Sequence, residues 1–168
     1  MERETIAAIA TGMGNAGIGI VRISGDDAIS VADGIFRGAI ALKDVESHRV
    51  VYGHIVDMET QAILDEVLET VFRAPRSYTR EDVVEISSHG GSFVMQQILS
   101  LVYRAGARAA EAGEFTKRAF LNGRIDLSQA ESVMDIIASD NERMLRNSLR
   151  QLDGALSVRI KFLRENIL

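Results

Sequence analysis

The chain has 168 residues, 46% of them hydrophobic, which is enough for one globular domain with an apolar core and a shorter additional segment. Its formal net charge of −5 argues against a general nucleic-acid-binding protein, because such proteins normally present a basic surface. Cysteine is absent, which excludes disulfides, thiolate metal sites and cysteine nucleophiles. The N-terminal residues show no signal-peptide pattern and no apolar run reaches membrane-spanning length, so we expect a soluble, cytoplasmic protein without membrane contact.

The first quarter of the chain predicts two strands joined by a glycine-rich loop and followed by a helix. Residues 5–10 are apolar and partly β-branched, as expected for a buried strand. The loop at 11–17 contains the pattern G-x-G-x-x-G, but strand-like residues follow its third glycine where a dinucleotide site would need a helix. We expect the helix over about 26–36, with Ser24 as its N-cap and Gly38 at its end.

The middle of the chain predicts a β-hairpin, a third strand and a second helix. The expected elements are strands over 49–57, 64–72 and 83–87 and a helix over about 92–104. The segment 74–82 holds the only proline and is rich in turn-forming residues. The His-Gly-Gly sequence at 89–91 fits either a tight turn or an anion-binding nest at the N-terminus of the helix that follows.

The stretch Gly113–Glu131 is dense in charged and polar side chains and predicts two helices joined by a tight link. Apolar residues at helical spacing indicate a short helix over 114–121, which the Asn-Gly pair after it would end. Ser128, with Glu131 three residues later, has the pattern of a capping box and predicts the start of the next helix. The spacing is compatible both with a plain helix–turn–helix hinge and with site residues held on the link.

The last predicted helix covers 141–168 and carries a continuous apolar stripe that reaches the final residue. A helix that ends within its apolar stripe needs a packing partner, and we expect that partner to lie beyond the end of this chain. The chain is therefore interpreted as part of a longer protein.

Three charged residues stand in unusual positions and are the candidate site residues. Arg22 and Glu85 each lie between apolar residues of a predicted strand, and Arg124 lies on the link between two helices. A charge in an apolar strand must face solvent, an opposite charge or a ligand, and solvent is the simpler explanation. Together the three could form a site for a polar, partly aromatic small molecule. No P-loop, metal-ligand spacing or nucleophile–base pair is present in the sequence, so we expect no catalytic residue and no metal site.

Several stretches of the chain, in this order, closely resemble the N-terminal part of the MnmE/TrmE family of tRNA-modification GTPases. The matching stretches are Thr5–Thr11, Gly17–Gly25, Ala74–Thr79, Glu81–Ile86, His89–Gly91 and Gly113–Glu131. They extend over nearly the whole chain, and their combination and order are highly specific.

The resemblance implies an α+β fold with a mixed β-sheet and flanking helices, similar to the folate domain of aminomethyltransferases, followed by a helical segment. Residues 1–121 would form a domain that binds tetrahydrofolate and dimerises. Residues 122–168 would begin a helical domain, into which the family inserts a Ras-like GTPase domain. That domain would hold GTP, magnesium and potassium; this chain lacks it and is not expected to hydrolyse GTP or to be catalytic alone.

The same resemblance implies a function in modifying the wobble uridine (U34) of certain tRNAs, together with an FAD-containing MnmG/GidA-type partner. A tetrahydrofolate derivative, 5-formyl- or 5,10-methylene-tetrahydrofolate, would be the one-carbon donor and would bind near a homodimer interface. An alternative is a dimerisation scaffold without a functional folate site. A stand-alone aminomethyltransferase-like enzyme is the least favoured alternative, because the residues show no acid–base pair.

The family motifs place folate contacts at Arg22, Glu85 and Arg124, the residues that already stood out by position. A carboxylate such as Glu85 can accept paired hydrogen bonds from the amino-pyrimidine edge of a pterin, and arginines can hold a formyl carbonyl or the carboxylates of a glutamate tail. The chain also departs from the family pattern. The loop at 11–17 lacks two prolines, Arg80 stands where glycine is usual, Ala112 replaces a proline, and Ser87-Ser88 stands where Asn-Cys is common.

Overall fold

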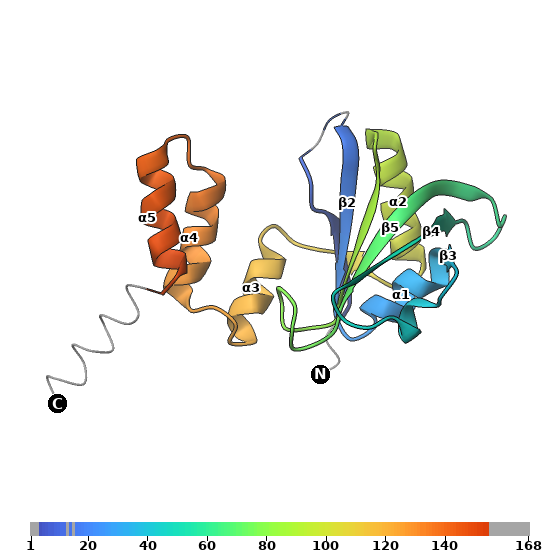
Figure 1. The fold of residues 1–168 in the computed structure, drawn as a ribbon, viewed down its shortest axis with the longest axis horizontal. Coiled ribbons are helices and arrows are strands. Elements are labelled where there is room, and N and C mark those ends of the chain that lie inside the picture. Colours follow the sequence, from blue (N-terminus) through green and yellow to red (C-terminus); the bar gives the residue numbers. More distant parts are fainter. Residues whose placement is uncertain (1–3, 13, 15, 155–168) are drawn as a thin grey trace, which may run out of the picture. The chain divides into compact units, whose positions relative to one another are not determined.

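A seven-stranded mixed sheet is the centre of the first part of the chain in the computed structural model, which describes residues 4–12, 14 and 16–154 (Figure 1). The strand order is β3-β4-β5-β6-β2-β1-β7. All neighbours are antiparallel except β1 and β7, which are parallel. The strands are β1 Ile6–Ile9, β2 Ala16–Ser24, β3 Phe36–Gly38, β4 Arg49–Val56, β5 Ile63–Phe72, β6 Val83–Gly90 and β7 Arg108–Ala109.

Helices account for most of the remaining regular structure. They are α1 Ala28–Ile35, α2 Ser92–Arg104, α3 Glu114–Leu121, α4 Leu127–Ile137 and α5 Glu142–Leu152, with a 3₁₀ turn η1 at Leu42–Asp44. The chain divides into two compact units, Met1–Phe115 and Thr116–Leu168, each of which is described by itself. The predicted α+β class with a mixed sheet and a helical continuation is confirmed.

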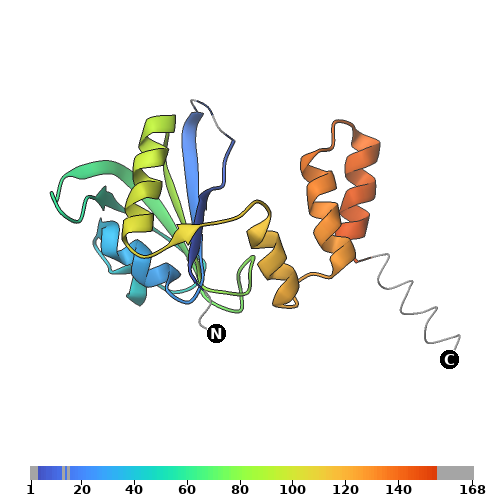
Figure 2. The same ribbon diagram turned by 180° about the vertical axis from the view of Figure 1, so that it is seen from behind.

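Helices α1 and α2 pack on one face of the sheet and build the core with it (Figures 1 and 2). Alternation along each strand sends one set of side chains into this core, among them Val21, Ile23, Val84 and Ile86, all fully buried. The alternate set forms what we call the second face. It comprises Ile18, Ile20 and Arg22 of β2, Tyr52 and His54 of β4, Glu66, Leu68 and Thr70 of β5, and Glu85, Ser87 and His89 of β6.

The first helix is shorter than the sequence predicted, and Ser24 does not cap it. Helix α1 begins at Ala28 after Asp27, whose side chain makes no cap hydrogen bond. Ser24 is still part of β2, and its hydroxyl lies against the segment 74–82. The helix ends at Ile35 because Phe36–Gly38 pairs with β4 as an edge strand.

The helical unit also differs in detail from the prediction. The capping box of α4 is formed by Asp126 and Gln129, not by Ser128 and Glu131. Asp126 has extended backbone and immediately precedes the first helical residue, so its carboxylate can accept the Gln129 N–H at 2.9 Å. Helix α5 ends at Leu152, before Gly154 with φ 80°. The part of the predicted 141–168 helix from residue 155 onward lies outside the described residues.

One carboxylate is buried in the sheet without a partner. Glu69 of β5 is 0% exposed, and neither of its carboxylate oxygens has a hydrogen-bond partner within the described part of the chain. Its register neighbours are Val51 and Ile86. Burial, together with the negative charge of Asp33 in α1, raises the pKa of Glu69 well above its ordinary value of 4.5.

We expect Glu69→Leu to stabilise the protein at neutral pH and to flatten its pH dependence. When folding raises the pKa of a carboxyl group, the stability linked to its proton is fully present below the pKa of the unfolded state. That stability is lost as the pH rises through the pKa of the folded state. The free energy of unfolding of the wild type should therefore fall by up to about 1.4 kcal/mol per pH unit above about pH 5. Urea unfolding at several pH values measures this, with exposed Glu46→Gln as the control. Equal pH slopes in the wild type and Glu69→Leu would contradict the prediction.

Candidate functional site

Two of the three predicted site residues form an ion pair on the second face. Strands β2 and β6 pair with Arg22 directly opposite Glu85. The Arg22 Nε donates to Glu85 Oε1 at 2.8 Å, and a second guanidinium nitrogen lies 2.7 Å from the same oxygen. Both side chains are partly exposed, at 27% and 23%. The pair is thus hydrogen-bonded and still partly accessible from outside the protein.

Two aromatic rings lie against the guanidinium of this pair. The guanidinium carbon of Arg22 is 5.5 Å from the centre of the Tyr78 ring and 5.6 Å from the centre of the Phe115 ring. Both distances are within the range of a cation–π interaction. Tyr78 comes from the segment 74–82, and Phe115 from the first turn of α3. Both residues lie in stretches that resemble the family motifs, but their positions in the sequence did not indicate that their rings meet at Arg22.

Buried hydroxyls hold the segment 74–82 against the sheet. The Ser24 hydroxyl is 2.7 Å from Thr79 Oγ1 and donates to Glu81 Oε2 at 2.7 Å. Ser24 and Thr79 are 0% exposed and Glu81 is 6% exposed. Because buried hydrogen bonds to a charged group are strong and directional, this contact fixes the segment that carries Tyr78.

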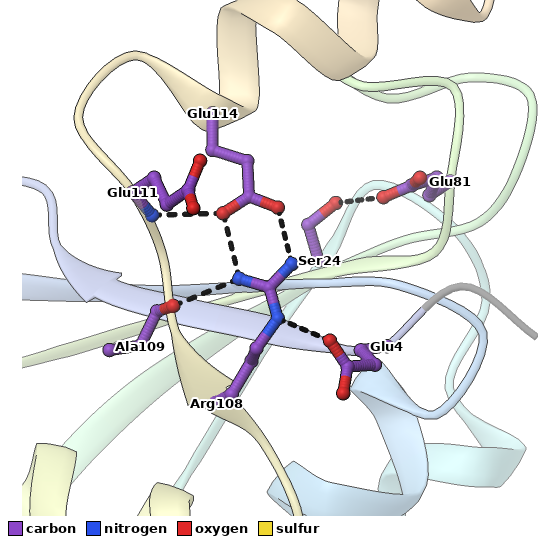
Figure 3. Close-up of polar contacts among 7 residues, drawn as sticks. All are labelled: Glu4, Ser24, Glu81, Arg108, Ala109, Glu111 and Glu114. Atoms are coloured by element: carbon purple, nitrogen blue, oxygen red, sulfur yellow. Dashed lines mark hydrogen bonds and ion pairs between the residues drawn. The ribbon is translucent and has the colours of Figure 1, made fainter.

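A second polar contact fixes the start of α3 (Figure 3). The Arg108 guanidinium donates two hydrogen bonds to the Glu114 carboxylate, at 2.7 and 2.8 Å, and its Nε donates to Glu4. The backbone N–H of Glu111 donates to Glu114 as well, at 2.8 Å. These carboxylates raise the pKa of Arg108, Glu114 most strongly. Glu114 is 7% exposed and directly precedes Phe115, so the contact also positions that ring.

Arg124, the third predicted residue, belongs to the second unit. It is exposed and follows Gly123, whose φ is 69°, and its backbone N–H closes the end of α3 on the carbonyl of Ala119 at 2.9 Å. The predicted break after α3 is therefore confirmed. A role for Arg124 beside the Arg22–Glu85 pair stays a prediction.

His89 is held by a carboxylate at the end of the ladder between β5 and β6. Asp65 accepts the backbone N–H of His89 at 2.9 Å and lies 2.7 Å from its Nδ1. The hydrogen bond to Asp65, its charge and the charge of Glu66 raise the pKa of His89. His89 lies within β6, which extends further than predicted, so it is not part of a turn. Two neighbouring carboxylates disfavour an anion at this place.

Residues 4–12, 14 and 16–154 contain no group of three or more histidines and carboxylates able to hold a metal ion. None of the helices in this part of the chain is long and apolar enough to cross a membrane. The candidate site is the Arg22–Glu85 pair with its aromatic neighbours.

Arg80 occupies the position where the resembling family usually has glycine, and its backbone is left-handed, with φ 60°. A residue with a side chain pays about 1–2 kcal/mol to adopt this backbone conformation, and glycine does not. Glycine also makes the unfolded chain more flexible, which offsets part of the stability that it would gain. We expect Arg80→Gly to raise the free energy of unfolding by about 1 kcal/mol in urea unfolding. Arg80→Ala removes the side chain but keeps the backbone cost, so a similar gain in both variants would contradict this explanation.

The chain is similar to proteins of one known family over nearly its whole length. The model of the family described as "GTP-binding protein TrmE N-terminus" matches residues 5–124. Proteins named tRNA modification GTPase MnmE are similar over nearly the whole chain: 54% identical over 168 residues in Shouchella clausii, 54% over 167 in Streptococcus sanguinis and 56% over 171 in Lachnoclostridium phytofermentans. The chain is covered at 99–100% in these matches but spans only 36–37% of the relatives' own length. With a family match over most of its residues and relatives at this identity, the chain belongs to the TrmE N-terminal family.

Proposed function

We propose that this chain binds a tetrahydrofolate derivative at the Arg22–Glu85 pair and forms a homodimer, as the N-terminal part of a tRNA wobble-uridine modification GTPase. The observation that carries the proposal is the pair itself. Two charges that the family resemblance assigns to folate contact are directly opposite each other in neighbouring strands, half-buried and hydrogen-bonded.

The geometry of the pair leaves acceptor and donor groups for a ligand. Both contacts from Arg22 go to Oε1 of Glu85, and the described residues give Oε2 no hydrogen-bond partner. A free, ionised carboxylate oxygen suits the N–H donors on the amino-pyrimidine edge of a pterin. The remaining nitrogen of Arg22 can donate to a carbonyl or carboxylate of the same ligand.

The wider functional assignment rests on the family. Residues 1–121 are proposed as the folate-binding and dimerisation domain, similar to the folate domain of aminomethyltransferases, and 122–168 as the beginning of a helical domain. In the full-length protein we propose a cytoplasmic complex with an FAD-containing MnmG/GidA-type protein that modifies U34 of tRNA. The folate derivative would donate the carbon, and GTP, magnesium and potassium would bind in the GTPase domain.

The second face of the sheet supports a homodimer. Its central row, in register, is formed by Tyr52, Leu68, Ser87 and Ile20, and the first two are 58% and 49% exposed. Large exposed apolar side chains that adjoin one another mark interaction surfaces. The adjoining rows carry both signs of charge, so the face is suited to pair with its own copy about a twofold axis. The alternative, a dimerisation scaffold without folate affinity, uses the same surface.

We expect wild-type protein to bind 5-formyl-tetrahydrofolate in calorimetric titration at about one per chain, and Glu85→Gln to bind about 10- to 150-fold more weakly. The substitution keeps the shape of the side chain but removes the charge that strengthens its hydrogen bonds by about 1.5–3 kcal/mol. Glu66→Gln, which changes a carboxylate of the second face on β5, should bind like the wild type. A folded Glu85→Gln variant with unchanged affinity would contradict the site, and a wild-type dimer without affinity would favour the scaffold.

We expect Leu68→Asp to convert the dimer to a monomer at concentrations where the wild type is dimeric, because it places a charge in the centre of an apolar contact. Light scattering on purified protein measures this. Phe93→Asp is the matched control, since Phe93 is a more exposed apolar residue, at 71%, but lies on α2. Dissociation of both variants, or of neither, would contradict the proposed interface.

A further inference from the structure

The way Arg22 meets Glu85 is unusual for an arginine–carboxylate pair and needs a cause. Such pairs commonly form a fork, in which two guanidinium nitrogens bind the two carboxylate oxygens. Here Nε and a second nitrogen both converge on Oε1, at 2.8 and 2.7 Å. A fork would engage both oxygens of Glu85, whereas the observed arrangement leaves Oε2 available.

We propose that Tyr78 and Phe115 are positioning residues of the ligand site: their rings hold the Arg22 guanidinium in the one-oxygen arrangement and so keep Oε2 of Glu85 free for the ligand. This inference rests on the proposed folate function and adds two residues to it. Each ring centre is close enough for a cation–π interaction, at 5.5 and 5.6 Å, and Arg22 remains partly exposed, so the attraction is only partly screened by water.

Each ring belongs to a segment that is fixed by contacts that do not involve Arg22. Tyr78 belongs to the segment that Ser24 anchors through buried hydrogen bonds to Thr79 and Glu81. Phe115 follows Glu114, whose carboxylate is held by the Arg108 fork and by a backbone N–H (Figure 3). Since the segments that carry both rings are fixed from outside the pair, the rings can select the conformation of the long and otherwise flexible arginine side chain.

The competing explanation is that the two rings only cover the site as apolar bulk. Leucine separates these explanations, because it fills a similar space without a π face. At position 78, phenylalanine and leucine both lose the hydroxyl, and only leucine also loses the ring. At position 115, tyrosine keeps the ring and leucine does not.

The test is calorimetric titration of 5-formyl-tetrahydrofolate into the wild type and the variants Tyr78→Phe, Tyr78→Leu, Phe115→Tyr and Phe115→Leu, with circular dichroism and thermal unfolding to confirm folding. We expect the leucine variants to bind about 2- to 30-fold more weakly, the range of a cation–π contact, and the aromatic variants to stay within about twofold of the wild type. In an Arg22→Leu background, Phe115→Leu should have no further effect on affinity.

The possible outcomes distinguish failure of the proposed folate function from failure of the positioning role of the two rings. Wild-type protein without affinity would overturn the proposed function and this inference with it. Binding by the wild type with equal affinity in the leucine and aromatic variants would overturn the positioning role while leaving the folate site intact. If the effects of Arg22→Leu and Phe115→Leu on the binding free energy were fully additive, the positioning role would also be overturned, because the ring would not act through the arginine.

Discussion

The register between β2 and β6 is the constraint on which the candidate site depends. It sets Arg22 opposite Glu85 and, on the other side of the sheet, sends Val21 and Ile23 into the core. A shift by one residue would exchange the two faces of a strand, placing charges in the core and isoleucine on the surface. Packing of the apolar core therefore fixes the register and, with it, the position of the ion pair. The ion pair alone would be too weak to define the register.

Polar contacts made by Ser24 of β2 and Arg108 of β7 fix less regular parts of the chain next to the sheet. The Ser24–Glu81 contact orders a segment with little regular structure, and the Arg108–Glu114 fork orders the entry into α3 (Figure 3). Both contacts are directional, and the Ser24–Glu81 contact is also buried, so each favours one arrangement of its segment. Glu69 shows the opposite case, because its carboxyl group is buried without a partner in the described residues, and this burial raises its pKa well above that of an exposed glutamate.

The departures of this chain from the family pattern affect the backbone at Arg80 and one side chain of the second face, Ser87, but not the charged pair. Arg80 stands at a usual glycine position and has the left-handed backbone that glycine adopts without cost, so the fold keeps the turn and bears the strain. Ser87, also a departure, takes part in the central row of the second face. Arg22 and Glu85, at which the family resemblance implies ligand contact in the sheet, are not among these departures.

Hydrophobic periodicity in the sequence by itself determined most of the elements, including the hairpin of β4 and β5 and the helices α2, α3 and α4. The same pattern also singled out Arg22 and Glu85 as charged residues among apolar ones. These depend on neighbours close in sequence, and local patterns report them well. Short-range caps were less predictable, since Ser24 and Ser128 have suitable side chains but Asp27 and Asp126 stand at the positions that precede the helices. Only the tertiary structure decided that Arg22 meets Glu85, Tyr78 and Phe115, because up to 93 residues separate these partners and strand order brings them together.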